Sequence, residues 1–201
     1  MAHNLTQADE YIPPDVARLM QQSVTPEQYE QLVYKHRDMW LELTSSGELI
    51  IMPPTGLESD ARNFNLTLQL GTWAEKDRSG ICFGPSGIFA LPNGAMRVPD
   101  AAWVKLEKWD RLTKHQQQRF GPLCPDFVVE LRSRTDRLTP LRNKMLEYME
   151  NGASLGWLID PFERRVYVYT PDREAIVLND PEAVSGDPLL PGFTLDLTEL
   201  W

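Results

Sequence analysis

Apolar and polar positions in the middle of the chain predict a strand, a helix and a second strand in succession. The first strand covers Pro125–Leu131, where two acids, Asp126 and Glu130, interrupt the apolar residues. The second has the sequence GWLID and ends at Asp160. Between them apolar side chains recur at helical spacing. This succession predicts an α/β protein with a mixed sheet.

The helix between these strands is expected to begin at Thr139-Pro140 and to end at Gly152. Its apolar stripe consists of Leu141, Met145, Tyr148 and Met149. Lys144 lies on the flank of this stripe, about 90° from its centre at roughly 100° per residue. Its aliphatic stem can follow the edge of the core while the ammonium reaches a site, although a surface lysine fits the same pattern.

Two further helices are predicted upstream. Thr25 caps the first and Gln28 completes a capping box, so this helix is expected to run to about residues 35–37. The second is expected over 57–77, with a buried face at helical spacing formed by Leu57, Ala61, Phe64 and Leu68. Residues 1–20 are expected to form a loosely ordered arm with one short helix.

The remaining apolar segments predict strands. Segment 40–52 reads as a hairpin in which Leu41 and Leu43 face the core and Glu42 faces solvent. Further strands are expected near 81–84, 87–91, 95–104, 164–170 and 174–178, with a polar helical segment at 105–121 and a short terminal strand. No clear linker divides the chain, so a single domain over 1–201 is expected.

Composition narrows the class of protein. The chain is 42% apolar and 24% charged, which is typical of a globular protein. Its net charge of −9 argues against a protein that coats nucleic acid, since phosphate contacts need basic surface. No apolar run reaches the roughly 18–20 residues of a membrane helix, and the N-terminus lacks a signal-peptide pattern. Cys82 and Cys124 form no CxxC motif, so a cytoplasmic protein is expected.

A basic segment at 132–144 interrupts this acidic chain. It contains one acid, Asp136, and five basic residues: Arg132, Arg134, Arg137, Arg142 and Lys144. Two interpretations stay open at this point. The segment is either a solvated loop and helix start or a contact for a polyanion.

Three acids are candidates for chemistry. Asp100 interrupts the apolar strand RVPDAAWV, where a buried carboxylate is costly unless it is paired or bound to a metal; the alternative is a turn aspartate. A neighbouring strand would bring Glu130 close to it. Glu58 lies in the first turn of its helix, where it can equally complement the helix dipole. His115 has no partner at metal-ligand spacing and is expected to be solvated.

Close, partly buried carboxylates repel each other unless a proton or a cation neutralises them. Oxygen ligands without His or thiolate favour Mg²⁺ or Mn²⁺. Such a cation would polarise a phosphate, and a lysine nearby would orient the attacking water or help to deprotonate it. Acids, a lysine and an arginine-rich approach therefore suggest phosphodiester hydrolysis.

The order of these residues resembles the PD-(D/E)XK nuclease superfamily. Pro99-Asp100 matches the PD motif, and Glu130-Leu131-Arg132 stands in the place of (D/E)XK. More closely, PPTGLES, RVPDAAWV, CPDFVVELRS and KMLEYMENGASLGWLIDP look like a bacterial restriction-endonuclease-like family of that superfamily. The resemblance extends from about Trp40 to the end of the chain.

This resemblance implies a restriction-endonuclease-like αβββαβ core with an extra N-terminal helix and hairpin and with C-terminal strands. It implies that Asp100 and Glu130 hold Mg²⁺ or Mn²⁺ and that Glu58 completes the site. The superfamily lysine would stand where this chain has Arg132, which stays protonated and is a poor base. In the family it is moved to the following helix, here to Lys144. Asp126 is a further candidate ligand.

The resemblance also implies DNA as substrate and a homodimer, because two sites cut two strands most easily. The candidate nucleic-acid contacts are Arg132, Arg134, Arg137 and Arg142. Two hypotheses follow. One is a magnesium-dependent DNA endonuclease. The other is a catalytically inactive nuclease-fold protein with a binding or structural role, which Arg132 and the acidic net charge favour.

Overall fold

The computed structural model describes residues 12–201, which form two compact units. The first unit consists of the described residues up to Pro54 together with Asn93–Arg97, and the second of Thr55–Pro92 and Val98–Trp201. The part of the predicted arm at 1–11 lies outside the described residues. The expected single domain stays a prediction.

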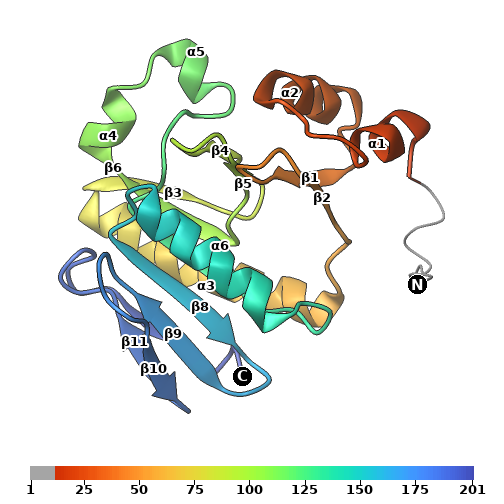
Figure 1. Ribbon diagram of the computed structural model, residues 1–201. Coiled ribbons are helices and arrows are strands. Elements are labelled where there is room, and N and C mark those ends of the chain that lie inside the picture. The colour runs from red at the N-terminus through yellow and green to blue at the C-terminus, as the bar shows by residue number, and fades with distance from the viewer. Residues whose placement is uncertain (1–11) are drawn as a thin grey trace. The chain divides into compact units, whose positions relative to one another are not determined.

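The first unit contains two helices and three short strands (Figure 1). They are α1 (Pro14–Leu19), α2 (Pro26–Lys35), β1 (Trp40–Leu43), β2 (Leu49–Met52) and β5 (Met96–Arg97). Thr25 and Gln28 form the predicted capping box at the start of α2. β1 pairs antiparallel with β2, as the hairpin prediction requires, and meets β5 where Leu43 lies opposite Met96.

Glu42 is buried, so its predicted exposure to solvent is wrong. Its residue is 3% exposed, and Arg97 Nη1 donates to its Oε2 over 3.0 Å. Leu41 and Leu43 are buried as expected. The alternation along β1 suggested one solvated face, but the cation that permits burial of Glu42 comes from 55 residues further along the chain.

The second unit is built on a six-stranded mixed sheet. Its elements are α3 (Leu57–Asp77), β3 (Gly80–Phe83), β4 (Phe89–Ala90), β6 (Ala101–Lys105), α4 (Leu106–Asp110), α5 (Lys114–Gln117), β7 (Phe127–Leu131), α6 (Leu138–Glu150), β8 (Leu155–Asp160), β9 (Arg165–Tyr169), β10 (Ile176–Asn179), β11 (Ala183–Ser185) and β12 (Thr194–Asp196). The strand order is β10-β9-β8-β7-β6-β3. β7 and β8 run parallel, joined by α6, and the other neighbouring pairs of this sheet are antiparallel. The succession α3, β3, β6, β7, α6, β8 is the predicted αβββαβ core.

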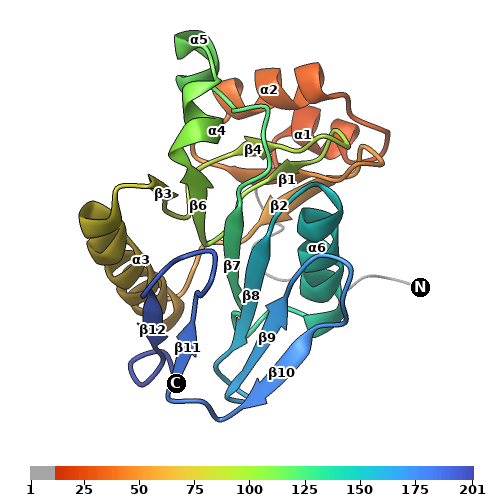
Figure 2. The same ribbon diagram turned by 90° about the vertical axis from the view of Figure 1, so that its left-hand side faces the viewer.

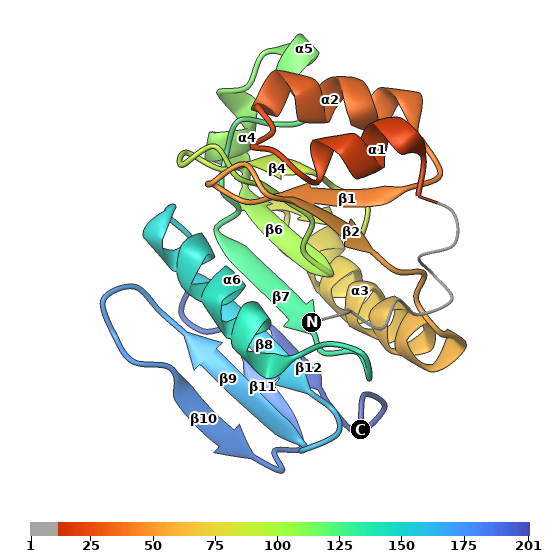
Figure 3. The same ribbon diagram turned by 45° about the vertical axis from the view of Figure 1, so that its right-hand side comes forward.

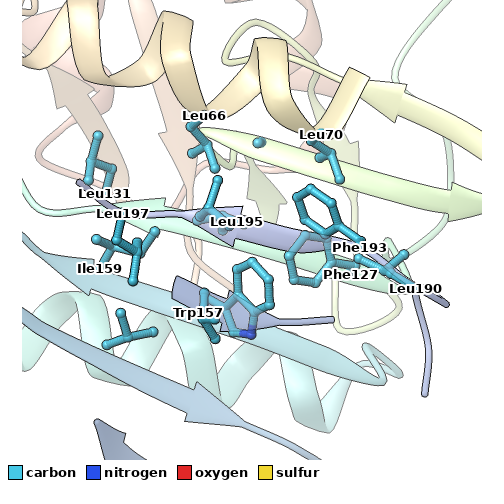
Figure 4. Packing of buried hydrophobic residues seen from close by; sticks show 14 of the residues in the cluster. Leu66, Leu70, Phe127, Leu131, Trp157, Ile159, Leu190, Phe193, Leu195 and Leu197 are labelled. Atoms are coloured by element: carbon cyan, nitrogen blue, oxygen red, sulfur yellow. The ribbon is translucent and has the colours of Figure 1, made fainter. Parts of the chain in front are cut away.

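Helices α3 and α6 cover opposite faces of this sheet (Figure 2). The main core lies on the face of the sheet that α3 covers, where α3 and the C-terminal hairpin of β11 and β12 pack against the strands (Figure 4). Its members alternate along the central strands and include Phe127, Val129, Leu131, Trp157, Ile159, Phe193 and Leu195. The intervening positions of β7, Val128 and Glu130, therefore point to the face that α6 covers.

The predicted buried face of α3 is wrong. Leu57, Phe64 and Leu68 are 90%, 68% and 55% exposed, and Leu66 and Leu70 are the residues packed into the core. Both sets fit helical spacing, so periodicity alone did not distinguish them. The choice is made by tertiary packing further along α3, where the ring of Trp73 lies 6.0 Å from that of Trp103 and 5.5 Å from that of Phe193.

Replacement of two glycines of this unit by alanine should change the stability of the protein in opposite directions. At Gly80 in β3 an added Cβ would lie 2.4 Å from the carbonyl oxygen of Val104, so we expect Gly80→Ala to destabilise the protein by about 1–3 kcal/mol. At Gly71 in α3 a Cβ would meet nothing within 4 Å, so Gly71→Ala should stabilise by about 0.5–1 kcal/mol. Urea unfolding of both variants measures the difference, and equal destabilisation would contradict this packing.

Candidate active site

The strand pairing of β6 with β7 brings two predicted acids together. Ala101 lies opposite Val129 and Ala102 opposite Val128, and the same register extended by one residue places Asp100 opposite Glu130. Opposed residues on antiparallel strands have Cβ atoms about 4.5–5.5 Å apart. Asp100 thus stands directly before β6, beside the end of β7.

Asp100 is partly buried and both of its oxygens accept hydrogen bonds. The backbone N–H of Leu131 donates to Oδ2 over 2.7 Å, and Asn63 Nδ2 donates to Oδ1 over 3.1 Å. Burial raises the pKa of Asp100, while the bond from Leu131, the charge of Lys144 and the bond from Asn63 act in the opposite direction. The carboxylate therefore sits where additional positive charge would stabilise it.

Glu130 is 4% exposed and is held by two residues of α6. Lys144 Nζ lies 2.8 Å from its Oε1, and the hydroxyl of Tyr148 donates to the same oxygen over 3.1 Å. Lys144 also donates to the carbonyl of Val98 over 3.1 Å. This arrangement fixes a nearly buried ammonium, whose side chain is 10% exposed, against one of the two acids.

Packing of α6 brings Lys144 to this position. The helix lies along β7 and β8 (Figure 3), with Met145 and Tyr148 buried against the sheet. Lys144 precedes Met145 and stands at the edge of that contact, as its place beside the apolar stripe predicted. The apolar pattern of the sequence predicts Tyr148 as a member of the stripe, and no sequence signal indicates the contact of its hydroxyl with Glu130.

Glu58 is placed differently from the other acids. Its side chain is 62% exposed, and its ion-pair partners among residues 12–201 are Arg62 at 2.9 Å and Arg134 at 3.8 Å. The contact between α3 and Asp100 comes from Asn63 instead. Sequence reasoning missed Asn63, because an amide on a helix carries no periodic or charge signal.

Part of the basic segment gathers around one aromatic ring. The guanidinium carbons of Arg134, Arg132 and Arg62 lie 5.0, 5.7 and 5.9 Å from the ring centre of Phe162. Arg132 is also tied to the fully buried Asp160 at 2.7 Å. Arg132 is therefore bound at the end of β8, and Lys144 is the cation that reaches Glu130.

The other two arginines lie elsewhere. Arg142 on α6 stands over the ring of Tyr167 at 4.6 Å. Arg137 is exposed and directly precedes α6. Asp126, the further candidate ligand, stands at the opposite end of β7 from Glu130, where it accepts from Lys105 N over 2.9 Å and pairs with Lys108 at 3.4 Å.

The donor set at Asp100 and Glu130 suits a hard cation. Within the described part of the chain no group of three or more His, Cys, Asp or Glu side chains is arranged to hold a metal ion. Mg²⁺, however, usually keeps several waters and needs only one or two protein carboxylates. Two adjacent carboxylates, one of them with a raised pKa, fit that requirement. None of the helices in residues 12–201 has both the length and the apolar character of a membrane span.

Comparisons with known proteins give the family and the fold of this chain. The family model Uma2, described as "Putative restriction endonuclease", matches residues 26–198. The fold is also similar to the crystal structure of a "putative nuclease belonging to DUF820" from Anabaena variabilis ATCC 29413, with a TM-score of 0.73 and 21% identity over 88% of this chain and 97% of that one. No curated protein matches the chain.

The raised pKa of Asp100 predicts that its charge destabilises the metal-free protein. Above the raised value the folded state must keep a poorly solvated carboxylate, so without divalent cations Asp100→Asn should stabilise the fold at pH 8 by about 1 kcal/mol, or about 2–4 °C in Tm. The gain should shrink as the pH falls toward the ordinary aspartate value of about 4, because the wild-type side chain then takes up a proton. Thermal unfolding in EDTA at pH 5 and pH 8 measures this, and a gain that grows on acidification would contradict it.

Proposed function

Because the chain belongs to the Uma2 family, we propose that it is an endonuclease that hydrolyses DNA phosphodiester bonds with the help of Mg²⁺ or Mn²⁺. The observation that carries this proposal is the cluster of Asp100, Glu130 and Lys144 at the end of the β6–β7 pair. This cluster suits hydrolysis at phosphorus, because its two acids can bind a cation and its lysine can orient the attacking water.

Asp100 and Glu130 are the residues that would hold the cation. When bound, the cation polarises the scissile phosphate and stabilises the charge that develops on it. The hydrogen bonds from Leu131 N and Asn63 hold the Asp100 carboxylate in one orientation, and Lys144 with Tyr148 does the same for Glu130. Such fixed orientation is what a catalytic constellation requires.

Lys144 would orient the attacking water through its ammonium, which the bonds to Glu130 and to the Val98 carbonyl keep in place. The water oxygen forms a bond to phosphorus and gives up a proton, the P–O ester bond breaks, and the leaving oxygen takes up a proton. Arg132 cannot serve in this role while its guanidinium is bound to Asp160. The predicted role of Glu58 as a further acid of the metal site stays a prediction; in the structure Glu58 pairs with Arg62 at the exposed start of α3.

For DNA binding we propose the four arginines of the basic segment, Arg132, Arg134, Arg137 and Arg142, joined by Arg62. The grouping of three of them around Phe162 supports this, since guanidinium groups bind phosphate well and an aromatic ring offers a surface for stacking. A homodimer is proposed as the form that cuts both strands.

The second candidate function is a nuclease-fold protein that binds without cutting. One observation favours it: the expected lysine position carries Arg132, which the structure uses for an ion pair with Asp160. Calorimetric titration with Mn²⁺ separates the two functions. A catalytic protein binds the ion through Asp100 and Glu130, whereas the inactive alternative predicts no binding heat.

Removal of any cluster member should abolish cleavage. We expect Asp100→Ala, Glu130→Ala and Lys144→Ala each to lower the rate of Mg²⁺-dependent DNA nicking at least about 100-fold, since the first two lose a ligand of the cation and the third loses the ammonium that orients the attacking water. Glu107→Ala is the matched control, because Glu107 is an exposed acid on α4 that pairs with the nearby Arg111. Nicking of supercoiled plasmid is the measurement. Unchanged rates in all three cluster variants would disprove this site.

Arg134 tests the DNA-binding proposal. Its side chain is 77% exposed, so Arg134→Ala should leave folding intact while removing one phosphate contact. The slope of log affinity against log salt should become shallower by about 0.9. Arg111→Ala, which removes a different exposed arginine directly after α4, is the control and should leave the slope unchanged. Fluorescence anisotropy with a DNA duplex in Ca²⁺ gives both slopes, and equal slopes for Arg134→Ala and wild type would refute the contact.

A further inference from the structure

The side-chain amide of Asn63 has a hydrogen-bond partner for its nitrogen but not for its oxygen in the described part of the chain. Its Nδ2 donates to Asp100 Oδ1 over 3.1 Å. An ionised carboxylate accepts hydrogen bonds and cannot donate them, so the nitrogen of the amide must face Asp100. The amide oxygen therefore points in a different direction from the nitrogen that faces Asp100.

That oxygen has no hydrogen-bond partner among residues 12–201. Asn63 Oδ1 is buried, and no hydrogen bond reaches it from any residue that the structure describes. A buried acceptor left unpaired costs about 1–3 kcal/mol, and a native structure that keeps one requires a specific reason. An ion beside the neighbouring carboxylate is such a reason.

A second asparagine on α3 provides a direct comparison. Asn65 Oδ1 accepts from Gln69 Nε2 over 2.6 Å, one turn along the helix. The helix thus satisfies the amide oxygen of Asn65 with its own side chains. The oxygen of Asn63, on the side of α3 that reaches Asp100, is left without such a partner.

We infer that Asn63 supplies a third oxygen ligand to the divalent cation held by Asp100 and Glu130, and that its Nδ2 orients Asp100 for the same ion. This inference rests on the proposed function. Amide oxygens bind hard cations together with carboxylates. A neutral donor also suits a site where Lys144 already offsets the charge of Glu130, because a third buried carboxylate would add repulsion.

Calorimetric Mn²⁺ titration of EDTA-stripped full-length protein tests this inference. Asn63→Ala should bind Mn²⁺ about 10–100-fold more weakly than wild type, since it loses both an oxygen ligand and the hydrogen bond that orients Asp100. Asn63→Asp restores an oxygen ligand, so it should bind at least as tightly as wild type and show a larger Mn²⁺-dependent rise in Tm. Asn65→Ala is the matched control and should bind within about twofold of wild type.

The outcomes separate the inference from the proposed function. If wild type binds Mn²⁺ and Asn63→Ala binds equally well, the ligand role is overturned and the proposed function stands. If Asn63→Ala and Asn63→Asp are both weakened, Asn63 only orients Asp100 and the ligand role is again overturned. If wild type binds no Mn²⁺, both proposals fail.

Circular dichroism checks that each variant folds. If Asn63→Ala does not fold, the Mn²⁺ affinity of Asn63→Asp alone decides whether Asn63 is a ligand.

Discussion

The structure around the site depends on two carboxylates that lie opposite each other on an antiparallel strand pair. The surrounding residues have to offset their charge. Asp100 and Glu130 would repel each other, and neither is well solvated. Hydrogen-bond donors reach the two carboxylates from three elements. They are the backbone of β7, the amide of Asn63 on α3, and Lys144 with Tyr148 on α6. Helices on both faces of the sheet thus contribute side chains to one end of the β6–β7 pair.

The position of the cation at Glu130 follows from how β7 ends. Arg132 lies beyond the last strand residue and turns to the buried Asp160 at the end of the neighbouring strand β8. Glu130 points instead to the face that α6 covers, so its counter-charge has to come from that helix. A lysine one residue before the buried Met145 meets this need, because its stem follows the helix edge while its ammonium reaches the acid.

Local patterns predicted much of this architecture. The caps and apolar runs gave α2, α3 and α6 and the central strands, and an acid inside each of two apolar strands pointed to Asp100 and Glu130. What failed depended on distant partners: Glu42 is buried because Arg97 reaches it, and the packed face of α3 was selected by contacts with other elements. Asn63 was beyond prediction from one sequence, because its meaning comes from a single contact 37 residues away.

The residues of the site lie far apart in the sequence, and this affects when a folding chain could first cleave DNA. The contacts that build it join residues 37, 31, 46 and 18 positions apart, and they cross from α3 to β6, β7 and α6. No short stretch of chain contains the assembly, and contacts of this range form late because loop closure must come first. A nascent or proteolysed fragment that ends before α6 would carry both acids but lack their lysine. Under the proposed function, such a fragment would lack the ammonium that orients the attacking water and would not cleave DNA.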